Sequence, residues 1–113
     1  VATSYGNIGN VYFRMKDYDK AIKAHTEALE IREKIFGKQS VEIVQSFNNL
    51  GNAYKEKKEY QQALKYYDQA LDLKIAQLGK GHKDLGRYYK NLSDVYYLMG
   101  NTKKGDEYKS LSQ

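Results

Sequence analysis

Residues 46–79 read SFNNLGNAYKEKKEYQQALKYYDQALDLKIAQLG, and the predicted fold rests on this stretch. In its first half, Phe47, Leu50 and Tyr54 recur at the spacing of one face of a helix. A short polar turn follows at residues 57–59. The second half carries a longer amphipathic pattern, with apolar positions at Tyr60, Ala63, Leu64, Tyr67, Ala70, Leu71 and Ile75. The stretch therefore predicts two helices joined by a tight turn.

The same pattern occurs 42 residues earlier in the chain. Residues 4–37 read SYGNIGNVYFRMKDYDKAIKAHTEALEIREKIFG and align with residues 46–79 without a gap. The residues of this copy that are identical in the next are Ser4, Asn7, Gly9, Asn10, Tyr12, Lys16, Tyr18, Ala21, Lys23, Ala28, Leu29, Gly37 and Lys38. A third copy begins at about residue 85 and keeps Tyr89, Asn91, Leu92, Val95, Tyr96 and Met99 in register.

The copies are expected to form one domain over residues 1–113. We place the repeats at about 1–42, 43–84 and 85–113, and the last of them is shortened. The expected helices are 2–16, 18–36, 40–58, 60–78, 83–99 and 102–111. Because one helical hairpin cannot bury its apolar face alone, the core is completed only when neighbouring hairpins stack.

Glycine and tyrosine recur at positions that suggest capping and packing. Gly37 and Gly79 follow the long helices, where a C-cap glycine belongs, and Gly100 precedes the last helix in the same way. The small residues expected to let the two helices of a hairpin approach closely are Gly9, Gly51 and Ser93. The large residues expected to fill the space between neighbouring hairpins are Tyr12, Tyr54 and Tyr96.

The composition excludes several classes of protein. Charged residues make up 29% and hydrophobic residues 41%, which is typical of a globular domain. The absence of cysteine removes disulfides, thiolate metal sites and cysteine nucleophiles, and favours a reducing, cytoplasmic location. No apolar run approaches the roughly 20 residues of a membrane span. The net charge is +5, but Lys and Arg are interspersed with Asp and Glu, so we expect no nucleic-acid partner and no membrane partner.

Neither histidine belongs to a recognisable site. His25 lies within the second helix of the first copy, and His82 lies in a Gly-Lys-Gly-His loop that favours a turn or cap role. The two are far apart in the chain, with no acidic residue at a metal-ligand spacing from them. The same loop lacks the strand and the full glycine spacing of a phosphate-binding loop. We therefore expect no metal, no cofactor and no enzyme activity.

The recurring residues resemble the tetratricopeptide repeat. Its pattern is an aromatic residue, Leu-Gly and Tyr in the first helix, then Ala, an aromatic residue and Ala in the second. The first copy supplies Tyr5, Ile8, Gly9, Tyr12, Ala21, His25 and Ala28, and the second supplies Phe47, Leu50, Gly51, Tyr54, Ala63, Tyr67 and Ala70. His25 stands in the place of the aromatic residue, which implies a packing role. The third supplies Tyr89, Leu92, Ser93 and Tyr96, then departs from the pattern at Gly105, Lys109 and Ser112. Its final helix is therefore expected to be weakly packed or to act as a polar cap.

This resemblance implies a specific architecture. The ordinary repeat is about 34 residues long, whereas the 42-residue period is similar to that of the kinesin light chain and nephrocystin type. The implied fold is all-α, a right-handed superhelix (an α-solenoid) of three helix-turn-helix hairpins. In the family, the first helix of each hairpin lines a concave groove.

Groove-lining side chains that recur with the period would form rows. Asparagine is a poor helix former, so helix propensity does not explain its repetition within the first helices. An amide has donors and an acceptor and can pair with both backbone groups of an extended peptide, as groove asparagines do in similar domains. The alternative is that these amides only bridge neighbouring helices. The candidate peptide-binding residues are Asn7, Asn10, Arg14, Asn49, Asn52, Lys55, Arg87 and Asn91.

A narrower alternative is a carboxylate clamp, as in co-chaperones that grip the acidic C-terminus of heat-shock proteins. Asn10, Asn49 and Arg87 match three of its positions. Gly6 stands where a lysine is expected, and Asn91 stands where an arginine is expected. The loss of two cations would remove much of the charge-assisted binding.

The leading hypothesis is a protein–protein interaction module that binds a peptide segment of a partner, with some acidic character, in its concave groove. The first alternative is a structural or self-assembling segment of a longer solenoid, which would form homo-oligomers through exposed repeat ends. A regulatory domain of a peptide-sensing transcription factor is a further alternative and would need an attached DNA-binding domain. The chain opens directly into helical sequence without an initiator methionine, so we expect it to be part of a longer protein.

Overall fold

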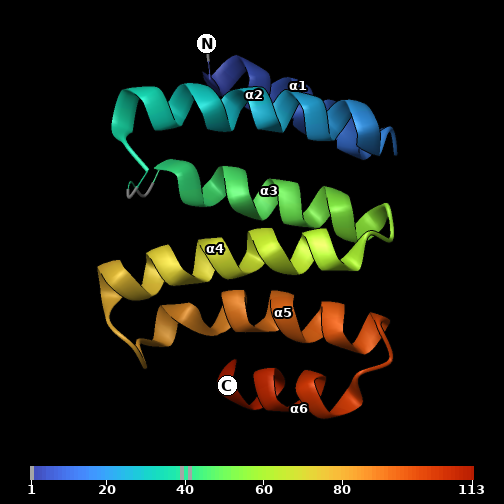
Figure 1. The fold of residues 1–113 in the computed structure, drawn as a ribbon, viewed down its shortest axis with the longest axis vertical. Coiled ribbons are helices and arrows are strands. Elements are labelled where there is room, and N and C mark those ends of the chain that lie inside the picture. The colour runs from blue at the N-terminus through green and yellow to red at the C-terminus, as the bar shows by residue number, and fades with distance from the viewer. Residues whose placement is uncertain (1, 39, 41) are drawn as a thin grey trace.

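The computed structural model describes residues 2–38, 40 and 42–113, and every structural statement below refers to these residues. They form α-helices and one short 3₁₀ helix, in an elongated body of 39 × 30 × 18 Å (Figure 1). In chain order the elements are α1 (Ala2–Arg14), α2 (Tyr18–Phe36), α3 (Glu42–Glu56), α4 (Tyr60–Leu78), the 3₁₀ helix η1 (Lys83–Leu85), α5 (Gly86–Leu98) and α6 (Thr102–Leu111).

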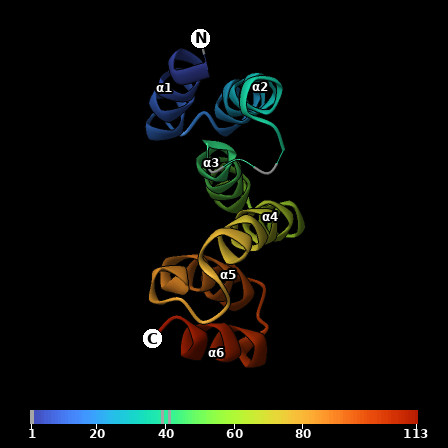
Figure 2. The ribbon, with the colours of Figure 1, turned by 90° about the vertical axis from the view of Figure 1, so that its left-hand side faces the viewer.

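The α-helices pair into three antiparallel hairpins, α1–α2, α3–α4 and α5–α6. Figure 2 shows these hairpins following one another from α1 at one end of the molecule to α6 at the other, so that the termini lie at opposite ends. Each hairpin packs on the next through contacts of α2 with α3 and of α4 with α5. The all-α solenoid of three stacked hairpins predicted from the sequence is therefore confirmed.

The three hairpin turns share one closure. In the first turn the amide of Asp17 donates to the carbonyl of Tyr12 at 2.9 Å, while Lys16 takes a φ of +63°. Lys58 with a φ of +69° and Gly100 with a φ of +83° occupy the same place in the other two turns. A left-handed residue followed by such a reversed hydrogen bond ends a helix in the manner of a Schellman motif. The first helices therefore end at 14, 56 and 98, one or two residues before the predicted ends at 16, 58 and 99.

We expect the Lys16→Gly and Lys58→Gly variants to be more stable than the parent protein. A side chain with a Cβ is strained in the left-handed conformation, which glycine adopts freely. After the added entropy of glycine in the unfolded chain, a gain of about 0.5–1 kcal/mol per site should remain. Denaturant unfolding would measure it. Lys57→Gly, one residue away and without a positive φ, is the control and should destabilise; a similar loss at position 58 would contradict the strain argument.

Two predicted helix starts also need correction. The third helix begins at Glu42 rather than at residue 40, because Ser40 Oγ accepts a hydrogen bond from the Glu42 amide at 3.1 Å; residue 41 lies outside the described residues. The fifth α-helix begins at Gly86 rather than at residue 83, because residues 83–85 form the 3₁₀ turn η1, where His82 Nδ1 accepts from the amide of Asp84 at 3.1 Å. The expected cap role of His82 is thereby confirmed.

Within each hairpin, a small residue on one helix faces a ring or a backbone group on the other. A Cβ built on Gly9 would lie 2.6 Å from the ring of His25, and one built on Gly51 would lie 2.6 Å from the ring of Tyr67. In the third hairpin, Ser93 Oγ donates to the carbonyl of Gly105 at 2.7 Å. The predicted close approach of paired helices at these small residues is confirmed, and so is the packing role of His25.

Two of the recurring tyrosines, Tyr54 and Tyr96, stack on rings of their own hairpins. The Tyr54 ring stacks on Tyr66 at 5.6 Å, and the Tyr96 ring stacks on Tyr108 at 5.5 Å. Both partners belong to the second helix of the same hairpin. These tyrosines therefore join the two helices of a hairpin. That they and Tyr12 also fill the space between neighbouring hairpins stays a prediction.

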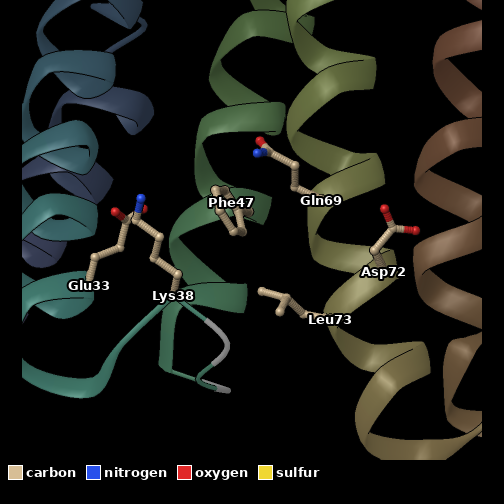
Figure 3. Close-up of a pocket in the computed structure, with 6 residues that line it drawn as sticks. All are labelled: Glu33, Lys38, Phe47, Gln69, Asp72 and Leu73. Carbon is tan, nitrogen blue, oxygen red and sulfur yellow. The ribbon is translucent and has the colours of Figure 1, made fainter.

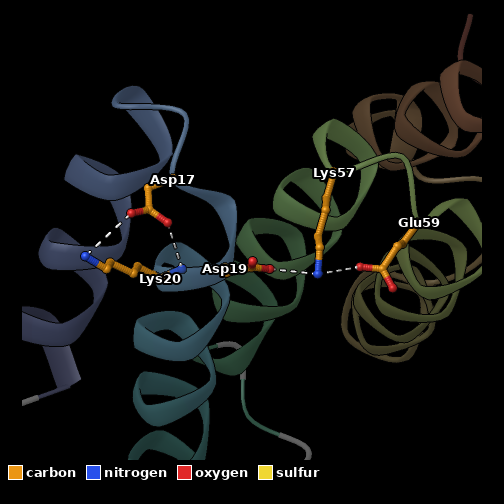
Figure 4. A network of polar contacts seen from close by, with 5 residues as sticks. All are labelled: Asp17, Asp19, Lys20, Lys57 and Glu59. Atoms are coloured by element: carbon orange, nitrogen blue, oxygen red, sulfur yellow. Dashed lines mark hydrogen bonds and ion pairs between the residues drawn. The ribbon is translucent and has the colours of Figure 1, made fainter.

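The last helix and one edge of the stack are polar. In α6 the only buried residue is Gly105, so this helix forms a weakly packed polar end. At the edge, the Lys57 ammonium lies 2.7 Å from Asp19 of the first hairpin and 2.9 Å from Glu59 of its own (Figure 4). Both carboxylates raise the pKa of Lys57. Because the lysine is well solvated, this bridge between hairpins adds little to the free energy of unfolding.

Candidate peptide-binding site

A hollow that gathers several predicted site residues lies between α3 and α5, with one wall from α4. Its volume is about 470 Å³. Its lining residues are Val44, Gln45, Asn48, Asn49, Asn52, Lys74, Arg87, Tyr88 and Asn91. Four of the eight predicted residues are therefore brought together here, and they come from two different repeats. The 42-residue period has this effect because it places the same face of successive first helices toward one side of the stack.

Two amides of this hollow have contrasting surroundings. Asn48 Oδ1 is buried and has no hydrogen-bond partner among the described residues. An unpaired buried acceptor is costly, and a ligand N–H would relieve that cost. Asn52 Oδ1, in contrast, accepts a hydrogen bond from the Tyr67 hydroxyl. The hydroxyl of Tyr67 is buried, and burial raises its pKa, so it remains a donor at neutral pH.

The cations of the hollow stand together at one end. Arg87 Nη2 donates to the Tyr88 hydroxyl at 2.9 Å, and its guanidinium carbon lies 5.0 Å from the centroid of the Tyr88 ring. A smaller hollow of about 290 Å³, lined by Lys74, Asp84, Arg87 and Tyr88, continues from this end. The arginine is thus oriented by its neighbour, and Lys74 adds a second positive charge beside it. Asp84 lines the same end, but two cations against one carboxylate leave it positive, which suits a carboxylate or another anionic group of a ligand.

The other half of the predicted set lies elsewhere. Asn7, Asn10 and Arg14 are on α1 and exposed, and Lys55 is half-buried on α3. None of them lines the hollow. Among the described residues, α1 packs against α2. The membership of these four residues in a binding site remains a prediction.

Sequence reasoning missed several residues that line the hollow. Lys74 belongs to α4, a second helix, and the resemblance assigned the groove to first helices only. Its counterpart one repeat earlier is Arg32, whose Nη1 donates to Ser46 Oγ at 2.6 Å. A basic residue at the same place in two second helices was visible in the sequence and would have pointed to this position.

A second hollow, of about 370 Å³, differs in character. Figure 3 shows Phe47 at its centre, with Glu33 and Lys38 on one side and Asp72 on the far side next to Gln69 and Leu73. Its charges are mixed, and no asparagine of the predicted rows lines it. Elsewhere among the described residues, no three metal-ligating side chains come together, and no helix is long and apolar enough to cross a membrane.

The sequence of the chain matches a known family of repeats. The Tetratricopeptide repeat sequence family matches residues 1–76 and again residues 42–104, which together span most of the chain. The chain belongs to the tetratricopeptide repeat family. The match in two overlapping registers follows the 42-residue period of the sequence. Among curated proteins, none matches the chain significantly.

Solved tetratricopeptide repeat structures superpose on most of the chain. BtubC (BKLC) from P. vanneervenii is 26% identical with a TM-score of 0.88, over 99% of this chain and 45% of that one. The putative kinesin light chain TPR-like repeats of Podosopora anserina are 16% identical with a TM-score of 0.82, over 97% and 52%. The TPR2AB domain of yeast Sti1, in its complex with pHSP90, is 22% identical with a TM-score of 0.79, over 98% and 39%.

These similarities establish the fold. The chain spans about half or less of each of those three proteins, so their activities and partners as whole proteins do not transfer to it. The expected likeness to kinesin-light-chain-type repeats is confirmed at the level of structure. The tetratricopeptide repeat is a scaffold of protein-interaction modules, and the coarse functional class of the chain follows from its membership.

Proposed function

We propose that residues 1–113 act as one peptide-binding domain, whose ligand lies in the hollow between α3 and α5. The observation that carries this proposal is the meeting of Asn49, Asn52, Arg87 and Asn91 around one open volume of about 470 Å³. Residues from two repeats converge there, and the half-exposed amides of Asn49 and Asn91 recur without the core contact that Asn52 makes with Tyr67. A repeated amide that the core does not need is best explained by a ligand.

The chemistry of the hollow matches an extended segment with an acidic residue. The amides of Asn49 and Asn91 offer both a donor and an acceptor to a peptide backbone. The unpartnered oxygen of Asn48 adds an acceptor for a backbone N–H. Lys74 and Arg87 lie at one end, where a carboxylate would receive charge-assisted hydrogen bonds. The pHSP90 complex of the yeast Sti1 domain, which has the same fold, supports this mode of binding.

The test is capture of peptides from a random 12-residue library, compared between the parent domain and the Asn49→Ala, Arg87→Gln double variant. Removal of one amide and one charged donor should weaken the selected peptides at least tenfold in Kd. Asn52 is left intact, because its loss would strand the buried hydroxyl of Tyr67 and confound binding with stability. Circular dichroism should show unchanged helicity in the variant.

Gln77→Ala, on the exposed end of α4, is the matched control and should bind as the parent does. Asn7→Ala asks whether the groove extends onto α1, and a loss of affinity would add that residue to the site. Equal affinity of the parent and the double variant would refute the site. If no peptide is captured and the sedimentation mass rises with concentration, the self-assembling solenoid segment becomes the better description.

A further inference from the structure

Two basic side chains of the second helices have a setting of their own. Arg32 on α2 and Lys74 on α4 are one 42-residue repeat apart, so they occupy the same register. Both are half-buried, and neither has an acidic residue three or four positions away along its helix. Every lysine of α2, α4 and α6 other than Lys74 is exposed and has Asp or Glu at one of these spacings. The pair therefore lacks the counter-charges that the other cations of the second helices have.

Arg32 is held at the junction between two first helices. Its Nη1 donates to Ser46 Oγ on α3 at 2.6 Å. Its Nη2 faces α1, where a Cβ built on Gly6 would lie 3.4 Å from it. The hydrogen bond and the close contact fix the guanidinium between α1 and α3.

The surroundings of this guanidinium recur in the hollow between α3 and α5. One repeat after Gly6 and Ser46 come Asn48 and Tyr88, and both of these line that hollow together with Lys74. In both places a cation from a second helix lies beside the same two positions of the first helices. The junction of α1 and α3 is therefore the neighbouring unit of the surface to which the hollow belongs.

No carboxylate neutralises Arg32 among the described residues, because it takes part in none of their ion pairs. Glu42 precedes Ser46 by one turn of α3, but it is exposed, and its carboxylate accepts from the Ser40 hydroxyl. A guanidinium has five N–H donors, and the bond to Ser46 uses one of them. A half-buried cation with donors to spare and no counter-ion is stabilised by an anion that approaches from solvent.

The separation of the two basic positions limits what can bind at both. Packed helices lie roughly 10 Å apart, so equivalent positions of neighbouring hairpins are separated by a similar distance. A polyproline II segment has three residues per turn and rises about 3.1 Å per residue. Acidic residues at positions i and i+3 of such a segment point to the same side and lie about 9 Å apart.

We propose that Arg32 is a second anion-binding position, and that the partner segment carries two acidic residues three positions apart. One carboxylate binds Arg32, and the other binds Lys74 and Arg87. Asn49 is one turn from Ser46 on α3 and lines the hollow, so its amide faces the backbone that joins the two carboxylates. This proposal rests on the proposed function, because the hollow between α3 and α5 must hold the same segment.

The test uses two hexapeptides of identical composition, acetyl-Ala-Glu-Ala-Ala-Glu-Ala-amide and acetyl-Ala-Glu-Glu-Ala-Ala-Ala-amide. NMR titration at about 0.15 M salt, where charges more than about 8 Å apart are screened, follows the Nε–Hε resonance of Arg32 and gives each Kd. The spaced peptide should move this resonance and bind about threefold more tightly than the isomer with adjacent acids. Equal affinities would overturn the proposal, because general attraction to a basic chain does not depend on the spacing of the acids.

Three variants examine the role of the arginine itself. Arg32→Gln should lower the affinity for the spaced peptide to that of the isomer. Arg32→Lys keeps the charge and supplies the residue of the second hairpin, so it should retain the preference for the spaced peptide. Lys34→Gln, at an exposed site on the same helix, removes an equal charge and is the matched control that should bind as the parent does. A preference that survives in Arg32→Gln would refute the role of Arg32.

The comparison of the two peptides needs only the parent protein. It therefore decides the proposal even if Arg32→Gln, which leaves the fully buried Ser46 without its donor, fails to fold. The Asn49→Ala, Arg87→Gln variant separates this proposal from the proposed function. Equal affinities of the parent for the two peptides, with both lost in that variant, would keep the peptide groove and overturn the second position. Absence of saturable binding of either peptide to the parent would overturn both.

Discussion

The Gly51→Ala variant is expected to lose about 2–3 kcal/mol of unfolding free energy, although alanine is the better helix former. A Cβ at this position would lie 2.6 Å from one carbon of the Tyr67 ring and 2.7 Å from a second. Tyr67 is 1% exposed, and its hydroxyl is hydrogen-bonded to Asn52, so the ring cannot turn away. The methyl group must instead push α3 and α4 apart, and this separation loosens the middle of the core.

Gly105→Ala is the matched control, because the same distance has the opposite consequence there. A Cβ on Gly105 would also lie 2.6 Å from a ring, that of Tyr97. Tyr97 is 37% exposed, and the bond from its hydroxyl to Asp106 is solvent-exposed, so the ring can swing toward solvent at little cost and relieve the clash. The better helix propensity of alanine, worth up to about 1 kcal/mol, then offsets the cost. Urea unfolding of both variants measures the difference, and equal losses would show that ring mobility does not decide the outcome.

The glycines at the helix–helix contacts illustrate what the sequence could predict. The recurrence of glycine at positions 9 and 51 was enough to infer close approach of paired helices, since a residue without a side chain leaves room for it. The consequence of filling each space depends on the burial of the facing ring. That burial is a property of the stacked hairpins and of the end of the solenoid, so it became visible only in the structure.

The helix ends show a second limit. Gly100 marks its turn by residue type, but Lys16 and Lys58 adopt the same left-handed conformation without any such mark. A lysine gives no local indication of a positive φ, so the predicted helices continued through both positions. The closure is imposed by the reversed hydrogen bonds of the turn and by the packing of the helices that it joins.

The candidate site was predictable in part for a similar reason. The 42-residue period identified Asn49 and Asn91 as equivalent, and the structure places both on one hollow. Periodicity could not distinguish α1, at the end of the stack, from α3, which has a neighbour on each side. It also could not show that the Oδ1 of Asn52 is engaged by Tyr67 while that of Asn48 is buried without a partner.

Acidification is expected to destabilise the protein through His25, and this is the second large effect. His25 is 2% exposed, packs against Gly9, and has an Nδ1 without a hydrogen-bond partner among the described residues. Burial, and to a lesser extent the positive charge of Arg32, lowers the pKa of His25 from 6.5 to about 4. The folded protein therefore holds this imidazole in its neutral form throughout the mildly acidic range.

The sign of the effect follows from proton binding. Between pH 6.5 and pH 4 the unfolded chain binds a proton at His25 and the folded protein does not, so stability falls as the pH falls. The slope approaches about 1.4 kcal/mol per pH unit, and the total loss by pH 4 is about 3 kcal/mol. Above pH 6.5 the histidine is neutral in both states and contributes no pH dependence.

His25→Tyr isolates this contribution from that of the carboxylates, which titrate in both proteins. Tyrosine is the residue that the second hairpin has in this register, where Tyr67 packs on Gly51 and donates to Asn52. The introduced hydroxyl would face Asn10, the counterpart of Asn52, so the variant is expected to fold. The measurement is the unfolding free energy in urea at half-unit steps from pH 7.5 to pH 4. The difference between variant and parent should grow by about 3 kcal/mol toward low pH. A constant difference would mean that His25 is protonated in the folded state, and that its burial is relieved by a local opening of the first hairpin.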